Sequence, residues 1–185
     1  MQELFQLLPD APFTKSRRKV VVLHGLGGIG KTQLAVEFSR QHQHRFSAIF
    51  WLDGSSKDSL KQSFIDALKR LPPDKLTANG LEALGNSVID TDLAVGECHQ
   101  WLSLASNHRW LLVFDNVDRD FHDNDDQQAY NVQSYFPPAD HGSILITSRL
   151  ASLYRLGSSV KVGTVAADEA KAILERYAER TIEGK

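Results

Sequence analysis

The strongest chemical pattern in the sequence is a glycine-rich segment at residues 25–32, which reads Gly-Leu-Gly-Gly-Ile-Gly-Lys-Thr. It fits the spacing G-x-x-x-x-G-K-S/T. Its glycines permit backbone angles closed to other residues, so the chain can curl around an anion with several N–H groups pointing inward. The helix expected after it adds the positive end of its dipole. The segment therefore predicts a cradle for the phosphates of ATP or ADP.

Two side chains of this segment complete the expected phosphate and metal contacts. Lys31 supplies a compact positive charge for the β- and γ-phosphates. The Thr32 hydroxyl is a hard oxygen suited to Mg²⁺. The residues of the segment and its flank that are expected to bind the nucleotide are Gly25, Gly27, Gly28, Ile29, Gly30, Lys31, Thr32 and Gln33.

A second motif is the apolar run at residues 110–114, which ends in a carboxylate, Asp115. We expect Asp115 to hold Mg²⁺ opposite Thr32, directly or through water. Asn116 occupies the next place, where many ATPases carry a second acid that polarises the attacking water. An amide can orient water but cannot accept its proton, so hydrolysis is expected to be slow or absent. Asp118 is either a substitute for that acid or a loop carboxylate.

A third motif is the expected strand at residues 143–147, which has the apolar centre Ile-Leu-Ile, ends in the hydroxyl residues Thr147 and Ser148, and is followed by Arg149. From its position alone, Arg149 is either a surface side chain or a contact to the γ-phosphate that distinguishes ATP from ADP. In the second case the catalytic set comprises Lys31, Asp115, Asn116 and Arg149.

The elements that would position these motifs alternate along the chain, as in β-strands joined by crossover helices. Strands are expected at residues 20–23, 48–52, 110–114, 143–147 and 160–162. Helices are expected at residues 2–8, 32–41, 57–71, 92–105 and 168–180, with a loop and short helix between 74 and 90. The pattern predicts a three-layer α/β/α fold of the P-loop NTPase type with a mainly parallel five-stranded sheet. All three motifs then lie at the carboxyl ends of strands, where such sheets bind ligands.

Several other residues are expected to have only structural roles. Asp92 is a candidate N-cap for the helix that follows it. His42 and His44 are two residues apart, would not share one helix face, and are expected at the surface. Cys98 has no His or Cys partner at metal-ligand spacing and is expected to pack as a small residue.

The composition is that of an ordinary soluble domain, with 42% hydrophobic and 24% charged residues. The formal net charge of −2 gives no global reason to expect nucleic acid or an anionic membrane as a partner. The single cysteine cannot form an internal disulfide, which favours a reducing compartment. Because neither a signal peptide nor a membrane-spanning apolar stretch is visible, we expect a cytoplasmic location.

With its three motifs in this order, the chain resembles the NB-ARC family of STAND P-loop NTPases, the switch modules of NOD-like receptors. The matching segments are residues 25–35, 46–52, 110–118, 142–149 and 160–170. The sequence of residues 111–118 is most like that of fungal members. The resemblance implies a module that binds ADP at rest, exchanges it for ATP and then oligomerises or engages protein partners. It also favours the γ-phosphate role for Arg149.

Two departures from the family pattern shape the remaining expectations. The Gly-Arg motif that members carry before their first helix is not present ahead of Gln2, and the chain stops before the winged-helix and helical subdomains. We therefore expect an excised core: a helix and linker at residues 1–19, the nucleotide-binding domain at 20–180 and a tail at 181–185. The function is expected to be an ATP/ADP switch with slow hydrolysis. The alternatives are a module that retains ADP without hydrolysis and, more weakly, a small-molecule kinase or GTPase.

Overall fold

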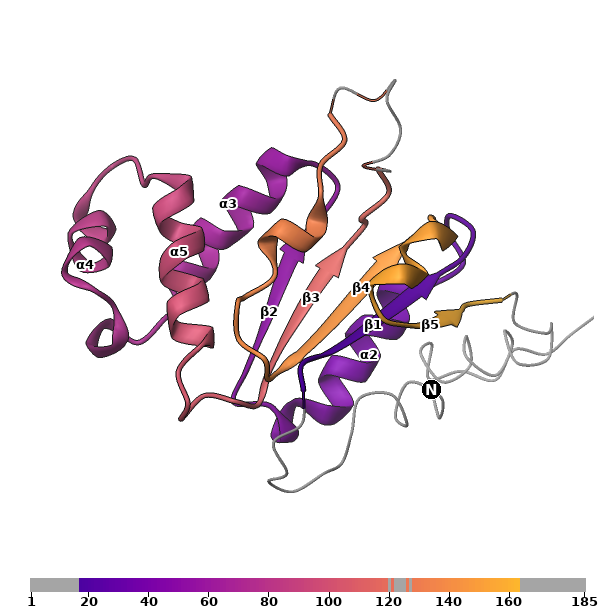
Figure 1. Ribbon diagram of the computed structural model, residues 1–185, viewed down its shortest axis with the longest axis horizontal. Coiled ribbons are helices and arrows are strands. Elements are labelled where there is room, and N and C mark those ends of the chain that lie inside the picture. Colours follow the sequence, from indigo (N-terminus) through magenta and orange to yellow (C-terminus); the bar gives the residue numbers. More distant parts are fainter. Residues whose placement is uncertain (1–16, 120, 122–125, 127, 164–185) are drawn as a thin grey trace, which may run out of the picture.

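Five short strands form one sheet at the centre of the computed structural model, which describes residues 17–119, 121, 126 and 128–163. The strands are β1 (Lys19–His24), β2 (Ala48–Asp53), β3 (Trp110–Asp115), β4 (Ser143–Ser148) and β5 (Ser158–Lys161). Their order across the sheet is β2-β3-β4-β1-β5, and every neighbouring pair is parallel. All five run in one direction, so their carboxyl ends meet at one edge (Figure 1).

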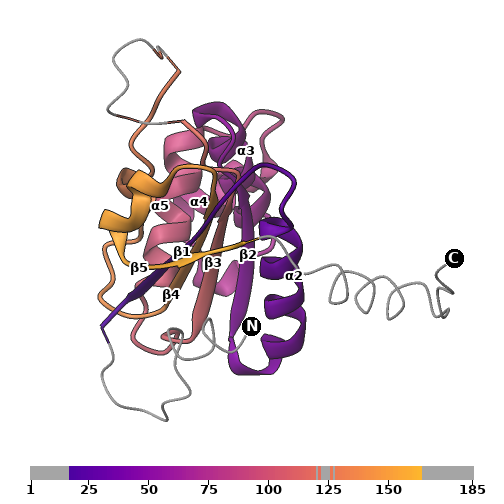
Figure 2. The same ribbon diagram turned by 90° about the vertical axis from the view of Figure 1, so that its right-hand side faces the viewer.

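Helices cover both faces of the sheet. The helices are α2 (Lys31–His42), α3 (Lys57–Leu68), α4 (Ala78–Gly85) and α5 (Thr91–Leu102). Figure 2 shows α2 on one side of the sheet and α3, α4 and α5 on the other. Two separate apolar clusters match these layers, because α2 contributes Ala35 and Phe38 to one and α3 contributes Leu60 and Phe64 to the other. The predicted three-layer α/β/α P-loop NTPase fold is therefore confirmed.

The position of each helix layer follows from the direction in which the chain crosses the sheet. The connection from β1 to β2, which contains α2, crosses the sheet in one direction. The connections from β2 to β3, from β3 to β4 and from β4 to β5 cross it in the opposite direction. Parallel crossovers are right-handed, so opposite directions place their connections on opposite faces. Accordingly, the later 3₁₀ helices, η3 (Val132–Tyr135) and η4 (Ala151–Leu156), contribute Val132 and Leu153 to the cluster on the α3 face.

The middle strands are apolar on both sides because helices cover both faces. Every residue of β3 is buried. Trp110, fully buried at its start, donates its indole N–H to the Leu102 carbonyl at 2.7 Å. Its ring lies over Gly142, where an added Cβ would come within 2.2 Å of Trp110 Cε2. Gly142 also has φ +83°, so this turn into β4 requires glycine for two reasons.

Two helices end earlier than the sequence pattern predicts. After α3 the chain tightens ahead of Pro72, because Leu71 donates its N–H to the carbonyl of Leu68, three residues back, and not to the carbonyl four residues back as in an α-helix. Leu71 is still buried in the cluster on the α3 face. In α5 the carbonyl of Leu102 accepts the Trp110 indole, and the helix stops there instead of at residue 105.

Two side-chain predictions are wrong. Asp90, not Asp92, caps α5, since the Asp90 side chain accepts the Leu93 N–H while the Asp92 carboxylate pairs with the Lys61 ammonium at 2.6 Å. His42 is buried rather than at the surface, with its ring edge-on to Phe38 at 4.9 Å between centroids.

His44 is exposed and Cys98 is buried, as predicted. The helices predicted at residues 2–8 and 168–180, and the tail at 181–185, lie outside the described residues. In the part of the chain that is described, no helix has the length and apolar character needed to span a bilayer.

Candidate functional site

The glycine-rich loop, residues 25–32, leaves the carboxyl end of β1 and curls back into α2. Gly28 and Gly30 have φ of +74° and +95°, in the left-handed region that glycine adopts without strain. At Gly25 an added Cβ would come within 2.5 Å of the Val162 carbonyl oxygen. The Val162 N–H in turn donates to the His24 carbonyl at 2.8 Å. The chain just after β5 is therefore packed directly against the start of the loop.

Lys31 is the first residue of α2 and is 9% exposed. Its ammonium donates hydrogen bonds to the carbonyls of Gly25 and Leu26, at 3.0 and 2.9 Å. These contacts place the positive charge inside the curl of the loop, beside the amino end of α2. A helix N-terminus and an enclosed ammonium together favour an anion at this position.

Asp115 lies opposite the loop and accepts hydrogen bonds from several side chains. Its Oδ1 accepts the Thr32 hydroxyl at 2.8 Å and the Thr147 hydroxyl at 2.5 Å. The strand order explains the arrangement, because β4 lies between β1 and β3 and carries Thr147 into the gap between the loop and Asp115. Asp115 is 6% exposed, and these two hydroxyl groups engage its Oδ1. The structure thus brings together two residues predicted from separate motifs, Thr32 and Asp115.

Asn116 adopts a left-handed backbone conformation with φ +62°. Its backbone N–H donates to the Thr147 hydroxyl at 3.0 Å, and its side-chain amide donates to Asp115 Oδ2 at 3.3 Å. Asparagine is among the few non-glycine residues that accept such a conformation readily. The amide therefore orients the Asp115 carboxylate and brings no proton acceptor of its own.

Arg149 follows the end of β4 and is held by Asp118. One Asp118 oxygen accepts the Arg149 backbone N–H at 2.6 Å, and the other accepts its Nε at 2.5 Å. This side-chain hydrogen bond, together with the charge of Asp118, raises the pKa of Arg149 above its ordinary value. The Arg149 stem passes beside the loop, since an added Cβ at Gly27 would lie 3.6 Å from Arg149 Cδ. The arginine predicted to sense the γ-phosphate therefore lies next to the phosphate loop.

The donor groups at this edge suit Mg²⁺. Thr32 and Asp115 present hard oxygen atoms that face each other across one hydrogen bond. Mg²⁺ in nucleotide sites is held by one or two protein oxygens, with phosphates and water completing the octahedron. Among residues 17–119, 121, 126 and 128–163, no group of three or more His, Cys, Asp or Glu residues could hold a metal. The Thr32 and Asp115 oxygens fit a nucleotide-bound magnesium ion.

The remaining predicted residues lie around this centre. Ile29 is half-buried in the loop, and Gln33 is exposed in the first turn of α2. Sequence reasoning missed Thr147 as a partner of Asp115 and Asp118 as the partner of Arg149. The hydroxyl residues at the end of β4 were visible, but only the strand order places them beside β3.

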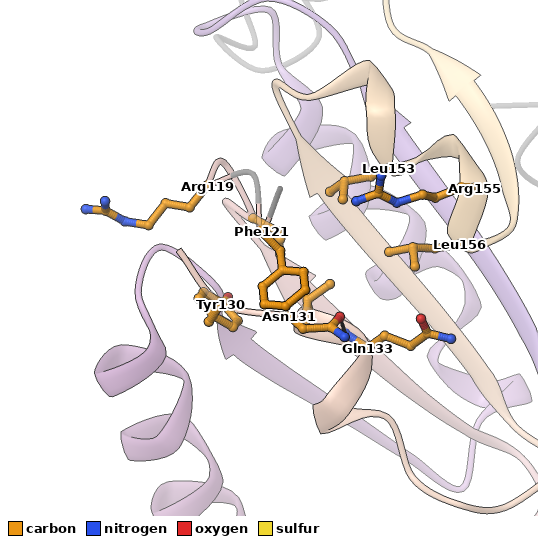
Figure 3. A pocket seen from close by; sticks show the side chains of 10 residues that line it. Arg119, Phe121, Tyr130, Asn131, Gln133, Leu153, Arg155 and Leu156 are labelled. Atoms are coloured by element: carbon orange, nitrogen blue, oxygen red, sulfur yellow. Dashed lines mark hydrogen bonds between the residues drawn. The ribbon is translucent and has the colours of Figure 1, made fainter. Parts of the chain in front are cut away.

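A separate cavity of about 220 Å³ lies between the chain after β3 and η4. Val117, Tyr130, Val132 and Leu153 line it, and they belong to the cluster on the α3 face. The Arg119 guanidinium extends away from the other lining side chains (Figure 3). Thr32 and Asp115 meet on the α2 side of the sheet, so this cavity is separate from the candidate phosphate site.

The parallel sheet, with the glycine-rich loop joining β1 to α2, defines the class of the domain as a P-loop NTPase fold. A solved structure of similar fold is that of Cdc6p from Pyrobaculum aerophilum. Its TM-score is 0.56 at 12% sequence identity, over 91% of this chain and 45% of that one.

The family is identified by a second match. A model of the NB-ARC domain family matches residues 5–181, and the chain belongs to that family. It is 25% identical over 171 residues to a nucleotide-binding leucine-rich repeat (NLR)-like protein from the fungus Hyaloscypha variabilis. The match covers 86% of this chain and 16% of that relative. The resemblance inferred from the motifs is confirmed, and the chain is a nucleotide-binding module of the NB-ARC type.

Proposed function

We propose that this chain is the nucleotide switch of a larger receptor, binding ADP or ATP with Mg²⁺ on residues 25–32 and hydrolysing ATP slowly. The observation that carries the proposal is the Thr32–Asp115 hydrogen bond of 2.8 Å beside a loop with two left-handed glycines. A phosphate cradle and a pair of magnesium ligands then lie side by side. The nucleotide contacts are proposed for Gly25, Gly27, Gly28, Ile29, Gly30, Lys31, Thr32, Gln33 and Arg149.

Each of these groups has a distinct proposed task. The loop amides bind phosphate oxygens, and Lys31 moves its hydrogen bonds from loop carbonyls to the β- and γ-phosphates. Magnesium bound to Thr32 and Asp115 neutralises charge on the phosphates. Arg149 reports the γ-phosphate, because Asp118 occupies its Nε and orients the guanidinium. Among the described residues, its two terminal nitrogens have no hydrogen-bond partner.

A second candidate function is a module that retains ADP and hydrolyses nothing. Asn116 favours it, because this amide is engaged with Asp115 and cannot take a proton from water. The two candidates predict the same nucleotide affinity and differ only in turnover.

The setting of the module is proposed from its relatives. We propose a cytoplasmic receptor in innate-immunity or incompatibility signalling, in which ATP binding leads to self-association or protein partners. The chain spans 16% of the length of the fungal relative, so other domains would supply the signal and its output. We further propose residues 20–180 as the nucleotide-binding domain, residues 1–19 as a linker segment and residues 181–185 as a tail.

Calorimetry followed by single-turnover hydrolysis tests the proposal on the purified chain. ADP and ATP should bind, with tighter binding when Mg²⁺ is present. The chain should release phosphate from bound ATP slowly, and Asn116→Asp should accelerate that release roughly tenfold by adding a carboxylate beside the attacking water. Binding without any turnover would establish the non-hydrolysing alternative. No binding of either nucleotide would refute both candidates.

A further inference from the structure

A second carboxylate lies beside Asp115 on the same face of the sheet. The strand register pairs Asp53, the last residue of β2, directly with Asp115, the last residue of β3. On β2, Trp51 packs against the cluster on the α2 face, and on β3 Val113 belongs to that cluster. Alternate residues of a strand share a face, so Asp53 and Asp115 both lie on the α2 side. Both strands end at the same edge of the sheet (Figure 1).

The backbone holds Asp53 in a fixed position. Its own N–H donates to Ser63 Oγ at 3.0 Å, and the N–H of Gly54 donates to the Asp115 carbonyl at 2.7 Å. The Tyr130 hydroxyl donates to the Gly54 carbonyl at 2.6 Å. An added Cβ at Gly54 would come within 2.6 Å of Val117 Cγ2, so the turn after β2 is packed tightly against the end of β3. Neighbouring strands are about 4.8 Å apart, which leaves the two carboxylates within reach of one bound water.

Within the described part of the chain, the Asp53 carboxylate has one oxygen engaged and one free. It is exposed, and its Oδ1 accepts the Ser55 N–H at 2.9 Å. Among the described residues, its Oδ2 accepts no hydrogen bond. Asp118, by contrast, has both oxygens engaged by Arg149, and Asn116 presents an amide. Of these three residues, Asp53 is the one with a free carboxylate oxygen next to Asp115.

We propose that Asp53 is the general base for ATP hydrolysis, a role that rests on the proposed function. Asp53 Oδ2 accepts a proton from a water molecule as one O–H bond breaks. The water oxygen bonds to the γ-phosphorus, and the bond from this phosphorus to the β–γ bridging oxygen breaks. ADP leaves with the electron pair of that bond, inorganic phosphate forms, and the proton on Asp53 passes to solvent. Positioned bases of this kind contribute about 10²–10⁴-fold to rate.

Single-turnover phosphate release from ATP·Mg²⁺, measured beside calorimetric ATP affinity, tests this role in the whole chain. Asp53→Asn keeps an oxygen that can accept the Ser55 N–H. It is expected to lower the hydrolysis rate roughly tenfold or more with ATP affinity changed by less than about threefold. Asp53→Ser, which also lacks a carboxylate, should show the same loss. Asp66→Asn is the matched control, because Asp66 is an exposed α3 carboxylate whose one ion pair among the described residues is with Lys69, and it should hydrolyse ATP as the wild type does.

The outcomes separate this inference from the proposed function. If the wild type binds no ATP, the proposed function fails and the role of Asp53 fails with it. If the wild type binds ATP but releases no phosphate, the general-base role is overturned while nucleotide binding stands. The same holds if the hydrolysis rate falls by less than about tenfold in both Asp53 variants.

Discussion

Replacing Lys31 by alanine removes the one charge enclosed by the glycine-rich loop. Lys31 is 9% exposed, and its ammonium donates to the carbonyls of Gly25 and Leu26. A bound polyphosphate would compete with those carbonyls for the same ammonium. The expected loss of affinity is therefore the difference between the phosphate attraction and the two hydrogen bonds that must be given up.

That difference can be worked out from the geometry. At an effective dielectric constant of about 20, an ammonium about 4 Å from each of two phosphate charges gains about 8 kcal/mol. Two hydrogen bonds from a charged donor contribute about 3–6 kcal/mol in total. The remainder of about 2–5 kcal/mol exceeds the 1.4 kcal/mol that corresponds to a tenfold change in affinity. We therefore expect Lys31→Ala to weaken ADP and ATP binding at least tenfold.

Isothermal titration calorimetry of both nucleotides measures the effect. Lys69→Ala is the matched control, because Lys69 lies at the carboxyl end of α3 and its side chain makes one exposed ion pair within the described part of the chain, with Asp66 at 3.3 Å. The control should bind nucleotide as the wild type does. An unchanged affinity in a folded Lys31→Ala chain would show that this ammonium does not face the phosphates.

Three further predictions concern the fold. Gly142→Ala should lower the free energy of unfolding by about 2–4 kcal/mol, because residue 142 has a left-handed backbone and the new methyl group would clash with the Trp110 ring. Urea unfolding measures this change, and a loss below about 0.5 kcal/mol would contradict the prediction. Burial lowers the pKa of His99, and its hydrogen bond to the Tyr135 carbonyl offsets only part of this effect. Below about pH 6.5 the unfolded chain therefore binds a proton at His99 more readily than the folded chain does. The free energy of unfolding should then decrease as the pH is lowered from about 7.5 to 5.5, and less steeply in His99→Gln than in the wild type. Equal pH slopes in the two chains would refute the role of His99. Burial raises the pKa of Cys98 to about 12, so its thiol should react with a disulfide reagent only after unfolding, whereas rapid labelling of the native chain would disprove its enclosure.

The strands and the phosphate loop could be predicted because their signals are local. The continuous apolar runs at residues 20–23, 110–114 and 144–146 each lie in a strand that is covered by helices on both faces. The loop could be predicted from its spacing, because Gly28 and Gly30 stand at left-handed positions that glycine adopts without strain.

The contacts that complete the site could not be predicted, because they depend on strand order. Thr147 reaches Asp115 only because β4 is inserted between β1 and β3. Asp118 and Arg149 are separated by 31 residues and meet because two strands end at the same edge. The register that sets Asp53 beside Asp115 is likewise invisible in the sequence of either strand.

Local competition explains the errors in helix boundaries and burial. Both Asp90 and Asp92 are suitable caps, and the pairing of Asp92 with Lys61 on a different helix decides between them. His42 is buried because Phe38, one helical turn earlier, packs against it. Such choices depend on tertiary neighbours that a residue pattern does not contain.

The central claim is that the backbone amides of the loop hold the phosphates. An amide ¹H–¹⁵N NMR titration of the chain with ADP and Mg²⁺ tests it most directly. The claim predicts that the largest shifts fall on Gly28, Gly30, Lys31 and Thr32, with smaller shifts elsewhere in the sheet. Saturable ADP binding that leaves these four amides unmoved would contradict it.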